Sequence, residues 1–334
     1  AHVTGVENKS VSADEDGLRL DRWFKKHFPN LPHSRLQKLT RTGQIRVDGK
    51  RVKTADRLLS GQNVRLPPMG LDTNEISRIP KPKKITANPE DLAMIQASII
   101  YEDIKAVAIN KPSGLASQGG TGTSRHVDGL MAALADDHER PKLVHRLDRD
   151  TSGVLLLAKT SKSAASLAKS FRDRSARKVY WAIIAGVPKV ERGRIDLALK
   201  KAGSRGSERM VWDDQEHGDK ASTDYAVLEK AGRFASLVAM MPLTGRTHQL
   251  RAHMAAIGHP ILGDGKYGGE KSILPGMSLP RGMLLHARSL DLPHPSGKGR
   301  LFIEADPPKA FTEALLTFNF NPSELRDPFI EAGR

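Results

Sequence analysis

The 334-residue chain contains no cysteine, and aromatic residues make up only 5% of it. Without cysteine the protein has no disulfide, no thiolate metal site and no cysteine nucleophile. It has no run of 18 apolar residues and no signal-peptide pattern, so we expect it to be soluble and cytoplasmic. Its 38% of hydrophobic residues predicts a folded chain, long enough for two domains. The sequence opens on Ala1, which leaves open whether an initiator Met or a longer leader precedes it.

Acidic residues are too few to balance the basic ones, and the formal net charge is +15. The excess is concentrated, because residues 17–68 hold 13 Lys or Arg and three Asp or Glu. A surface that only keeps the protein soluble would spread this charge, whereas phosphate contacts need basic side chains close together. The distribution therefore indicates a polyanionic partner that binds this segment.

Residues 15–68 are predicted to form a small α/β domain. Apolar residues recur at helical spacing over 20–28, and Ser34 is expected to cap a second helix that Gly43 ends. Asp48-Gly49 is the expected turn of a β-hairpin, and a last strand follows over 64–66. In the order of these elements the segment resembles the S4-type RNA-binding module. The resemblance implies one basic face on the second helix and the hairpin, formed by Arg35, Lys38, Arg41, Arg46, Lys50 and Arg51.

The rest of the chain is predicted to contain one larger domain with flexible connections. Residues 1–14 indicate a flexible tail, the Pro- and Lys-rich residues 69–92 an extended basic linker, and residues 319–334 a C-terminal tail. Over 93–318 strands and helices do not alternate regularly, which favours an α+β fold with a mixed, mainly antiparallel sheet flanked by helices and loops. The clearest expected elements are strands over 106–109, 153–158, 179–185 and 234–240 and helices over 161–171 and 249–257.

The densest polar segment of the larger domain is LVHRLDRDTSGVLLLAK, residues 143–159. Asp148 and Asp150 lie there with Arg146 and Arg149, directly before an apolar strand. Nearby positive charge holds a carboxylate ionised, so that it can act as a nucleophile or a base at neutral pH. A structural salt-bridge network has the same composition, and these residues alone do not separate the two interpretations.

The segment HRLDRDTSG matches, at every fixed position, the signature HRLDxxTSG of the RluA family of pseudouridine synthases. This resemblance implies that Asp148 is the essential catalytic carboxylate, whereas Asp150 falls at a variable position. Residues 110–120, NKPSGLASQGG, resemble the first strand and loop of the family. Residues 177–186, RKVYWAIIAG, resemble its second motif, whose active-site tyrosine maps to Tyr180.

The third motif of the family resembles residues 244–268, TGRTHQLRAHMAAIGHPILGDGKYG. The family pairs an arginine with the catalytic carboxylate, and the resemblance implies that this arginine is Arg251. Arg246 is the alternative, and otherwise it is expected to contact the RNA backbone. A guanidinium can hold a carboxylate by two parallel hydrogen bonds. The closing strand of the family resembles MLLHARSL, residues 283–290, and implies that Leu285 packs beside the uracil. The predicted substrate pocket thus consists of Arg146, Leu285, Arg246, His248 and Gln249.

The resemblance covers residues 17–305 and implies the pseudouridine synthase fold with an S4-like domain before it. It also implies an isomerisation that breaks the N1–C1′ bond of uridine and rejoins the base through C5, for which we expect no cofactor, no metal and no obligate protein partner. The expected substrate is structured RNA, and the class of the family that resembles the chain modifies bacterial large-subunit ribosomal RNA. Attack of Asp148 on C1′, attack on the base and proton abstraction at C2′ all stay open.

Three alternatives are open. A non-catalytic RNA-binding or ribosome-assembly protein would have the same charge, but a carboxylate among its phosphate-binding arginines would repel the ligand. A metal-dependent hydrolase would use Asp148, Asp150 and histidines. However, His248 and His253 are five residues apart and do not share a helical face, and with His259 they match no known zinc spacing. The third alternative is a pseudouridine synthase that acts on transfer RNA.

Overall fold

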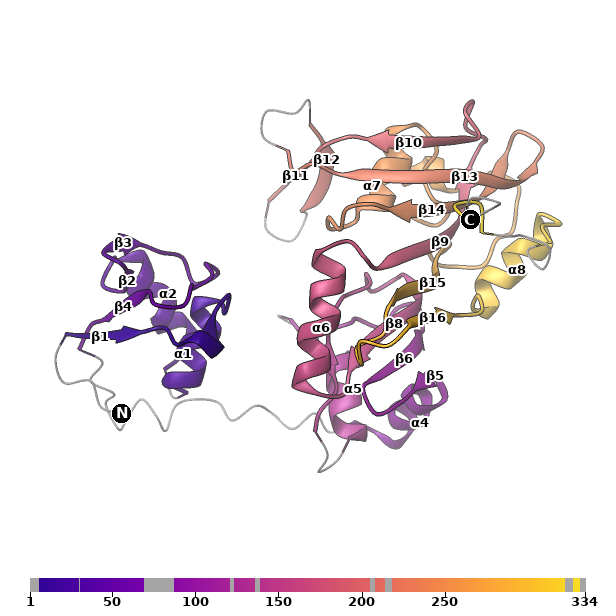
Figure 1. Ribbon diagram of the computed structural model, residues 1–334. Coiled ribbons are helices and arrows are strands. Elements are labelled where there is room, and N and C mark those ends of the chain that lie inside the picture. Colours follow the sequence, from indigo (N-terminus) through magenta and orange to yellow (C-terminus); the bar gives the residue numbers. More distant parts are fainter. Residues whose placement is uncertain are drawn as a thin grey trace. The chain divides into compact units, whose positions relative to one another are not determined.

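The computed structural model describes residues 6–29, 31–68, 87–120, 123–135, 139–204, 208–213, 218–321 and 327–330. The chain divides into two compact units, Ala1–Lys83 and Lys84–Arg334 (Figure 1). Most of the predicted linker over 69–92 lies outside the described residues. Within the described part, no helix is both long and apolar enough to span a bilayer.

The described residues of the first unit form a four-stranded antiparallel sheet with two α-helices. Its elements are β1 (Glu7–Ser10), α1 (Leu20–His27), α2 (His33–Arg41), β2 (Arg46–Val47), β3 (Lys50–Arg51) and β4 (Asn63–Leu66), together with the short 3-10 helix η1 (Ala13–Glu15). The strand order is β1-β4-β2-β3. Asp48 and Gly49 both have positive φ, 46° and 76°, which confirms the predicted hairpin turn. Trp23 and Phe24 of α1 are fully buried in the core of the unit, as the helical spacing predicted.

Two predictions for the first unit are wrong. Residues 1–14 are not simply a tail, because Glu7–Ser10 pair with β4 as an edge strand. All four residues of β1 are exposed, so the strand has no apolar alternation by which the sequence could indicate it. Ser34 does not cap the second helix, because α2 begins at His33 with Pro32 as its N-cap. The φ of Pro32 is fixed by its ring, so the helix starts there and places Ser34 inside the first turn.

The second unit is built on a ten-stranded sheet. Its strands are β5 (Ile99–Glu102), β6 (Ala106–Lys111), β7 (Lys142–Leu143), β8 (Ser152–Ala158), β9 (Arg177–Ala185), β10 (Arg192–Asp196), β13 (Ser222–Ala231), β14 (Ala235–Pro242), β15 (Leu285–Pro293) and β16 (Arg300–Glu304). The main order is β10-β13-β14-β9-β15-β8-β6-β5, and β16 and β7 pair with β15 and β8. Of the strand pairs in the described residues only β8 with β15 is parallel, which confirms the predicted mixed, mainly antiparallel sheet and the α+β class.

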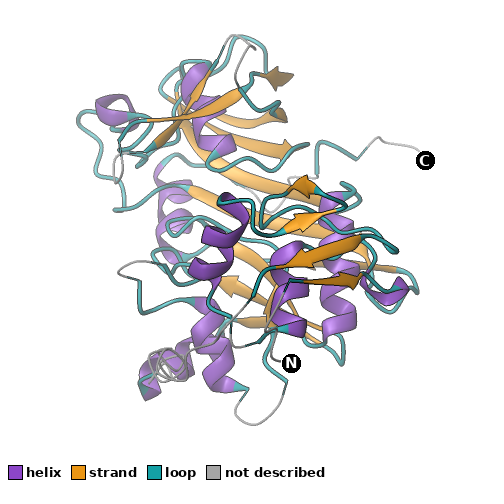
Figure 2. Ribbon diagram, turned by 90° about the vertical axis from the view of Figure 1, so that its left-hand side faces the viewer, coloured by secondary structure: helices purple, strands orange, loops and turns teal. Residues whose placement is uncertain are grey.

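Helices and a small hairpin lie alongside this sheet (Figure 2). They are α4 (Pro89–Ala97), α5 (Val127–Leu134), α6 (Ser161–Arg172), α7 (Gln249–Ala256), α8 (Lys309–Thr317), the 3-10 helix η2 (Gly269–Ser272), and the hairpin of β11 (Leu199–Ala202) and β12 (Arg209–Trp212). Successive side chains of a strand point to opposite faces of the sheet, so neighbouring residues pack against helices on opposite faces. On β8, Leu156 packs with the α6 side, whereas Leu155 and Leu157 pack with α4 and α5.

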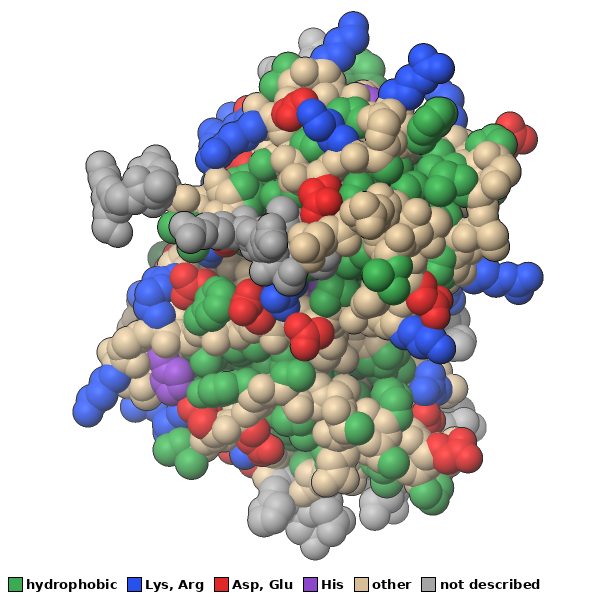
Figure 3. Space-filling model, turned by 90° about the vertical axis from the view of Figure 1, so that its right-hand side faces the viewer, with side chains coloured by type: hydrophobic (Ala, Val, Ile, Leu, Met, Phe, Trp, Pro, Cys, Tyr) green, Lys and Arg blue, Asp and Glu red, His purple; other side chains and the backbone are tan. Residues whose placement is uncertain are grey.

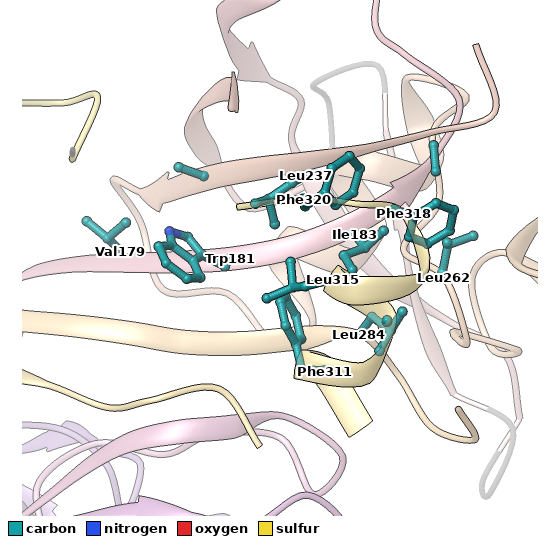
Figure 4. Close-up of a cluster of buried hydrophobic side chains, with 13 residues drawn as sticks. Val179, Trp181, Ile183, Leu237, Leu262, Leu284, Phe311, Leu315, Phe318 and Phe320 are labelled. Carbon is teal, nitrogen blue, oxygen red and sulfur yellow. The ribbon is translucent and has the colours of Figure 1, made fainter. Parts of the chain in front are cut away.

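The same alternation on β9 places Tyr180. Trp181 and Ile183 pack against α8 on one face of the strand, with Phe311 and Leu315 (Figure 4). Ala182 and Ile184 have the opposite parity and pack on the side of α7. Tyr180 shares this parity, so its ring lies on the face of the sheet that α7 covers.

The predicted C-terminal tail over 319–334 is wrong for its described part. Phe320 is buried and stacks on Phe318, with ring centroids 5.4 Å apart. Phe329 packs against the same core, and Asp327 forms an ion pair with Arg177 at the start of β9. This segment has too few apolar residues to show a helix or strand period, yet Phe320 and Phe329 both pack in the core of the larger unit.

Gly153 is required where β8 runs parallel to β15. Its φ is +110°, and a Cβ atom there would lie 2.2 Å from the carbonyl oxygen of Ala287. We expect Gly153→Ala to lower the free energy of unfolding by about 3 kcal/mol or more, because backbone strain adds to the steric overlap. Urea unfolding measures this effect. Gly120→Ala is the matched control, since a Cβ there meets no atom within 4 Å, and equal midpoints for the two variants would contradict the prediction.

Candidate active site

A cleft of about 1110 Å³ lies beside the loop that carries Asp148. Its walls are this loop between β7 and β8, the turn from α6 into β9, and residues 241–248 before α7. A second hollow of about 130 Å³ shares part of this lining and includes Arg251 and Leu285. The structure thus brings together, from segments more than 100 residues apart, all eight predicted residues of the catalytic group and substrate pocket: Arg146, Asp148, Tyr180, Arg246, His248, Gln249, Arg251 and Leu285.

The loop that carries Asp148 is anchored by a lysine that the sequence analysis missed. Lys111 at the end of β6 is fully buried and donates hydrogen bonds to the carbonyl oxygens of Pro112, Leu115 and Arg149. Burial lowers the pKa of Lys111 to about 7, although the negative charges of Asp150 and Asp148 oppose this shift. Lys111 is the polar last residue of the strand AVAINK, so its position in the sequence does not indicate this role.

Asp148 is partly accessible, with 28% of its side chain exposed. Its Oδ2 atom lies 3.4 Å from Nη1 of Arg251 and 3.7 Å from Nε2 of His248. The Asp148 backbone oxygen accepts a hydrogen bond from the N–H of Thr151, which closes the turn into β8. The carboxylate therefore faces a cleft while its charge lies next to a guanidinium.

Arg251 does not hold Asp148 by two parallel hydrogen bonds, so this expectation is wrong. Its Nε and Nη2 donate to the two carboxylate oxygens of Asp264, at 2.7 and 2.8 Å, and only Nη1 reaches Asp148. Asp264 is buried and also accepts from the backbone N–H groups of Lys266 and Tyr267, so its geometry is fixed. Burial disfavours the charge of Arg251, but hydrogen bonds to Asp264 and the charges of Asp264 and Asp148 raise its pKa above the usual value.

Tyr180 and Leu285 lie on neighbouring strands at the second, smaller hollow. Burial raises the pKa of the Tyr180 phenol well above its usual value, and the negative charge of Asp148 adds to this shift. The phenol is therefore neutral at physiological pH. Leu285 is buried at the start of β15 and gives the hollow an apolar wall. Together they offer a flat ring and an aliphatic side chain, the surroundings that suit a planar base.

Gln249 lines the smaller hollow, but both ends of its side-chain amide are hydrogen-bonded within the protein. The amide nitrogen donates to the carbonyl oxygen of Ser222 and to Oγ1 of Thr223. The amide oxygen accepts from Oγ1 of Thr244 and from the N–H of Arg246. Gln249 therefore lines the predicted pocket and also braces residues 244–248 against β13. All four of these hydrogen bonds are within the protein.

The histidines do not form a metal site. His253 bonds to Thr223 and to the carbonyl oxygen of Leu197, and His259 bonds to the carbonyl oxygen of Ala185. His248 points elsewhere, towards Asp148. In the part of the chain that the structure describes, no group of three His, Asp or Glu side chains could share an ion. The geometry gives no support to the alternative of a metal-dependent hydrolase.

His145, the first residue of the HRLD segment, has a structural place. Its ring stacks on Phe171 of α6 with centroids 4.5 Å apart, and its Nε2 accepts the backbone N–H of Leu156. Burial lowers the pKa of His145 to about 3, and the positive charge of Lys178 adds to this shift. His145 is therefore neutral and packs the catalytic loop against α6.

The outer wall of the cleft is strongly basic, which the sequence analysis did not predict. Arg172, Arg174, Arg177 and Lys178 line it from the end of α6 to the start of β9. Burial lowers the pKa of Lys178 from its usual value. The segment RDRSARK over 172–178 carried the signal, as a run of cations between two predicted elements.

The comparisons with known proteins agree with this geometry. The model of the RNA pseudouridylate synthase family matches residues 105–256. The chain is 35% identical over 314 residues to the ribosomal large subunit pseudouridine synthase C of Salmonella typhi. The alignment covers 93% of this chain and 96% of that protein. It is also 35% identical over 304 residues to the protein of the same name in Escherichia coli (strain K12), with 90% and 92% covered.

Among solved structures, the chain is similar to human RNA pseudouridylate synthase domain containing 4. The TM-score is 0.57 at 27% identity, and the match covers 69% of this chain and 97% of that one. The chain therefore belongs to the family of RNA pseudouridylate synthases, which confirms the resemblance and the pseudouridine synthase fold. It is a pseudouridine synthase, an isomerase that acts on RNA.

Proposed function

We propose that this pseudouridine synthase isomerises specific uridines of bacterial large-subunit ribosomal RNA, with Asp148 as its catalytic carboxylate. The observation that carries the proposal is the meeting of Asp148, Tyr180 and Arg251 at one cleft. The RNA class is supported by the names of relatives whose alignments cover at least nine-tenths of both chains. We propose the free RNA or an assembly intermediate of the subunit as the substrate.

The cleft suits a uridine that has left the RNA helix. Extrusion of a base costs about a few kcal/mol of stacking, and contacts in the pocket offset this cost. Tyr180 would stack on the uracil, and Leu285 would pack beside it. The N1–C1′ bond then breaks, the base turns, and C5 bonds to C1′ while the proton on C5 is released and N1 gains one. Asp148 next to Arg251 has the charge for each of the three routes: attack on C1′, attack on the base, or proton abstraction at C2′.

Basic side chains of both units would bind the RNA backbone. In the second unit these are Arg172, Arg174 and Lys178 of the cleft wall, since Arg177 is paired with Asp327. In the first unit we propose an S4-like role for α2 and the hairpin, where Lys38, Arg41, Lys50 and Arg51 are exposed. Arg46 instead donates to the carbonyl oxygens of Gly43 and Gly49 and holds the hairpin turn, and Arg35 is half-buried. On the face drawn in Figure 3, by contrast, Lys and Arg alternate with Asp and Glu.

Salt dependence measures these phosphate contacts. We expect Arg172→Gln with Arg174→Gln to weaken RNA binding and to flatten the slope of log affinity against log salt concentration by about 1.4 to 1.8, because each lost phosphate contact removes about 0.7 to 0.9. Lys38→Gln with Arg41→Gln should have a similar effect through the first unit.

The matched control is Lys298→Gln with Lys309→Gln, two exposed lysines that do not line the cleft. This pair removes the same charge and should leave the slope within about 0.5 of that of the wild type. Equal slopes for all three double variants would show that only net charge matters, which would contradict the proposed contacts.

Tritium release tests the proposed reaction. Large-subunit RNA that lacks the modification is labelled with C5-tritiated uridine, and the enzyme should release tritium as C5 bonds to the ribose. Transfer RNA and small-subunit RNA labelled in the same way are the comparison substrates. Release from transfer RNA alone would replace the proposed substrate, and tight binding without release from any RNA would favour the non-catalytic alternative.

A further inference from the structure

Tyr267 contacts both residues that approach the carboxylate of Asp148. The guanidinium carbon of Arg251 lies 4.9 Å from the centroid of the Tyr267 ring. The Tyr267 hydroxyl lies 2.9 Å from Nδ1 of His248, and the two rings meet edge to face. Asp264 and Tyr267 lie in the same turn. Both residues contact Arg251, and Tyr267 also contacts His248.

The hydrogen bonds of Tyr267 determine where its proton points. The backbone N–H of Met210 in β12 donates to the phenol oxygen at 2.9 Å. The phenol keeps its proton, because burial raises its pKa above the usual value. Among the described residues, Nδ1 of His248 is the only acceptor within hydrogen-bond distance of that proton. A neutral histidine whose Nδ1 accepts a hydrogen bond carries its own proton on Nε2.

The Nε2–H of His248 then faces Oδ2 of Asp148 at 3.7 Å. This distance is long for a hydrogen bond, but such contacts commonly shorten when substrate closes the site. Nη1 of Arg251 approaches the same oxygen, so neither contact involves Oδ1. We propose that His248 is a positioning residue whose tautomer is set by Tyr267, and that it and Arg251 hold Oδ2 so that Oδ1 is presented to the uridine. This inference rests on the proposed role of Asp148.

The backbone at His248 agrees with a positioning role. Its φ of 51° and ψ of 24° lie in the left-handed region, which is uncommon for a residue with a side chain. The bonds of Gln249 to Thr244 and Arg246 hold the segment in this conformation. Strain of this kind persists only where the surroundings fix it, and it clusters at functional sites.

The surroundings of His248 favour its neutral form. Burial is the largest cause that lowers its pKa below the usual value, and the positive charges add to it while the negative ones oppose it. The groups that face the ring are Asp148, Arg251, Asp264, Lys266 and Tyr267. Because the pKa is lowered, the neutral form persists as the pH falls to values at which an ordinary histidine is already protonated.

Nitrogen NMR of the full-length protein labelled with ¹⁵N-histidine tests the tautomer without any RNA. His248→Gln identifies the signals of His248 among those of the 12 histidines. Between about pH 6 and pH 8 we expect the pattern of a neutral ring with its proton on Nε2. In Tyr267→Phe, Nδ1 has lost its donor, so the ring should protonate at a higher pH than in the wild type. A proton on Nδ1, or a doubly protonated ring at neutral pH, would overturn the assignment.

Single-turnover kinetics test the positioning role. His248→Leu should slow the isomerisation step by up to about 10²-fold, because misplacement of a reacting group has an effect of that size. RNA affinity should stay within about twofold. His248→Gln keeps a donor at the position of Nε2 and should recover most of the rate. A loss of affinity with an unchanged rate would make His248 an RNA contact instead. If the wild-type enzyme releases no tritium, the proposed function fails, whereas the NMR result still decides the tautomer.

Discussion

Asp148→Asn should abolish pseudouridine formation, with the rate lower by about 10⁴-fold or more, as is found when an essential catalytic group is removed. The substitution keeps the shape of the side chain and removes its charge and its nucleophilic oxygen. Because Asp148 is partly exposed and makes one long hydrogen bond to Arg251, the fold and most of the RNA affinity should persist. Tritium release and a filter-binding assay measure the two quantities separately.

Asp150→Asn is the matched control for this variant. Asp150 lies two residues further along the same loop, is 42% exposed, and pairs only with Arg149 among the described residues. It carries the same charge on the same loop. We expect its activity to stay within about threefold of the wild type, since exposed ion pairs contribute little. A similar loss in both variants would assign the effect to loop charge and would refute the role of Asp148.

Arg251→Met should have the second large effect, on activity and on stability together. The guanidinium is 8% exposed, and its main partner, Asp264, is 1% exposed. Removal of one member of a buried pair leaves an uncompensated charge and costs about 3 to 5 kcal/mol of unfolding free energy. The loss of a preorganised charge beside Asp148 should also slow the reaction by about 10²- to 10³-fold. Thermal unfolding and single-turnover kinetics measure the two losses.

The two losses can be separated by a second change. In Arg251→Met with Asp264→Asn, no buried charge is left unpaired, and the amide can still accept from the N–H groups of Lys266 and Tyr267. Most of the stability should therefore return, while the activity should stay low because Asp148 still lacks its cation. Recovery of activity in the double variant would show that Arg251 serves only the fold.

The residues of the candidate site could be predicted because their neighbours in the sequence are unusual. Asp148 lies in a run of polar residues that match the family signature, directly before a buried strand. Tyr180 is the single aromatic residue among the β9 side chains on the face that α7 covers. Residue type and order along the chain were sufficient to name them. The alternation of the strands then brings them to one face, because successive side chains of a strand point to opposite sides of a sheet.

The partners of these residues could not be predicted in the same way. Asp264 lies in a glycine-rich turn, where a carboxylate normally faces solvent, and only the packed structure shows that it is buried under Arg251. Lys111 looks like the polar end of a strand, although its ammonium group is enclosed by three carbonyl oxygens. β1 has no apolar face at all. The contacts of Lys111 and β1 are made to backbone atoms, and the pair of Arg251 and Asp264 forms between a helix and the turn that follows it. Residue patterns report none of these contacts.

The pairing of Arg251 with Asp264 has a consequence for charge balance during turnover. Arg251 and Asp264 together are neutral, so the negative charge of Asp148 is surplus to them. If Asp148 becomes esterified or protonated along the reaction, the enclosed part of the site passes from one net negative charge to none. A site in which Arg251 had only Asp148 would instead be left with an unbalanced cation at that moment. Because Asp264 already balances the charge of Arg251, Asp148 can lose its own charge during the reaction without leaving a buried charge unpaired.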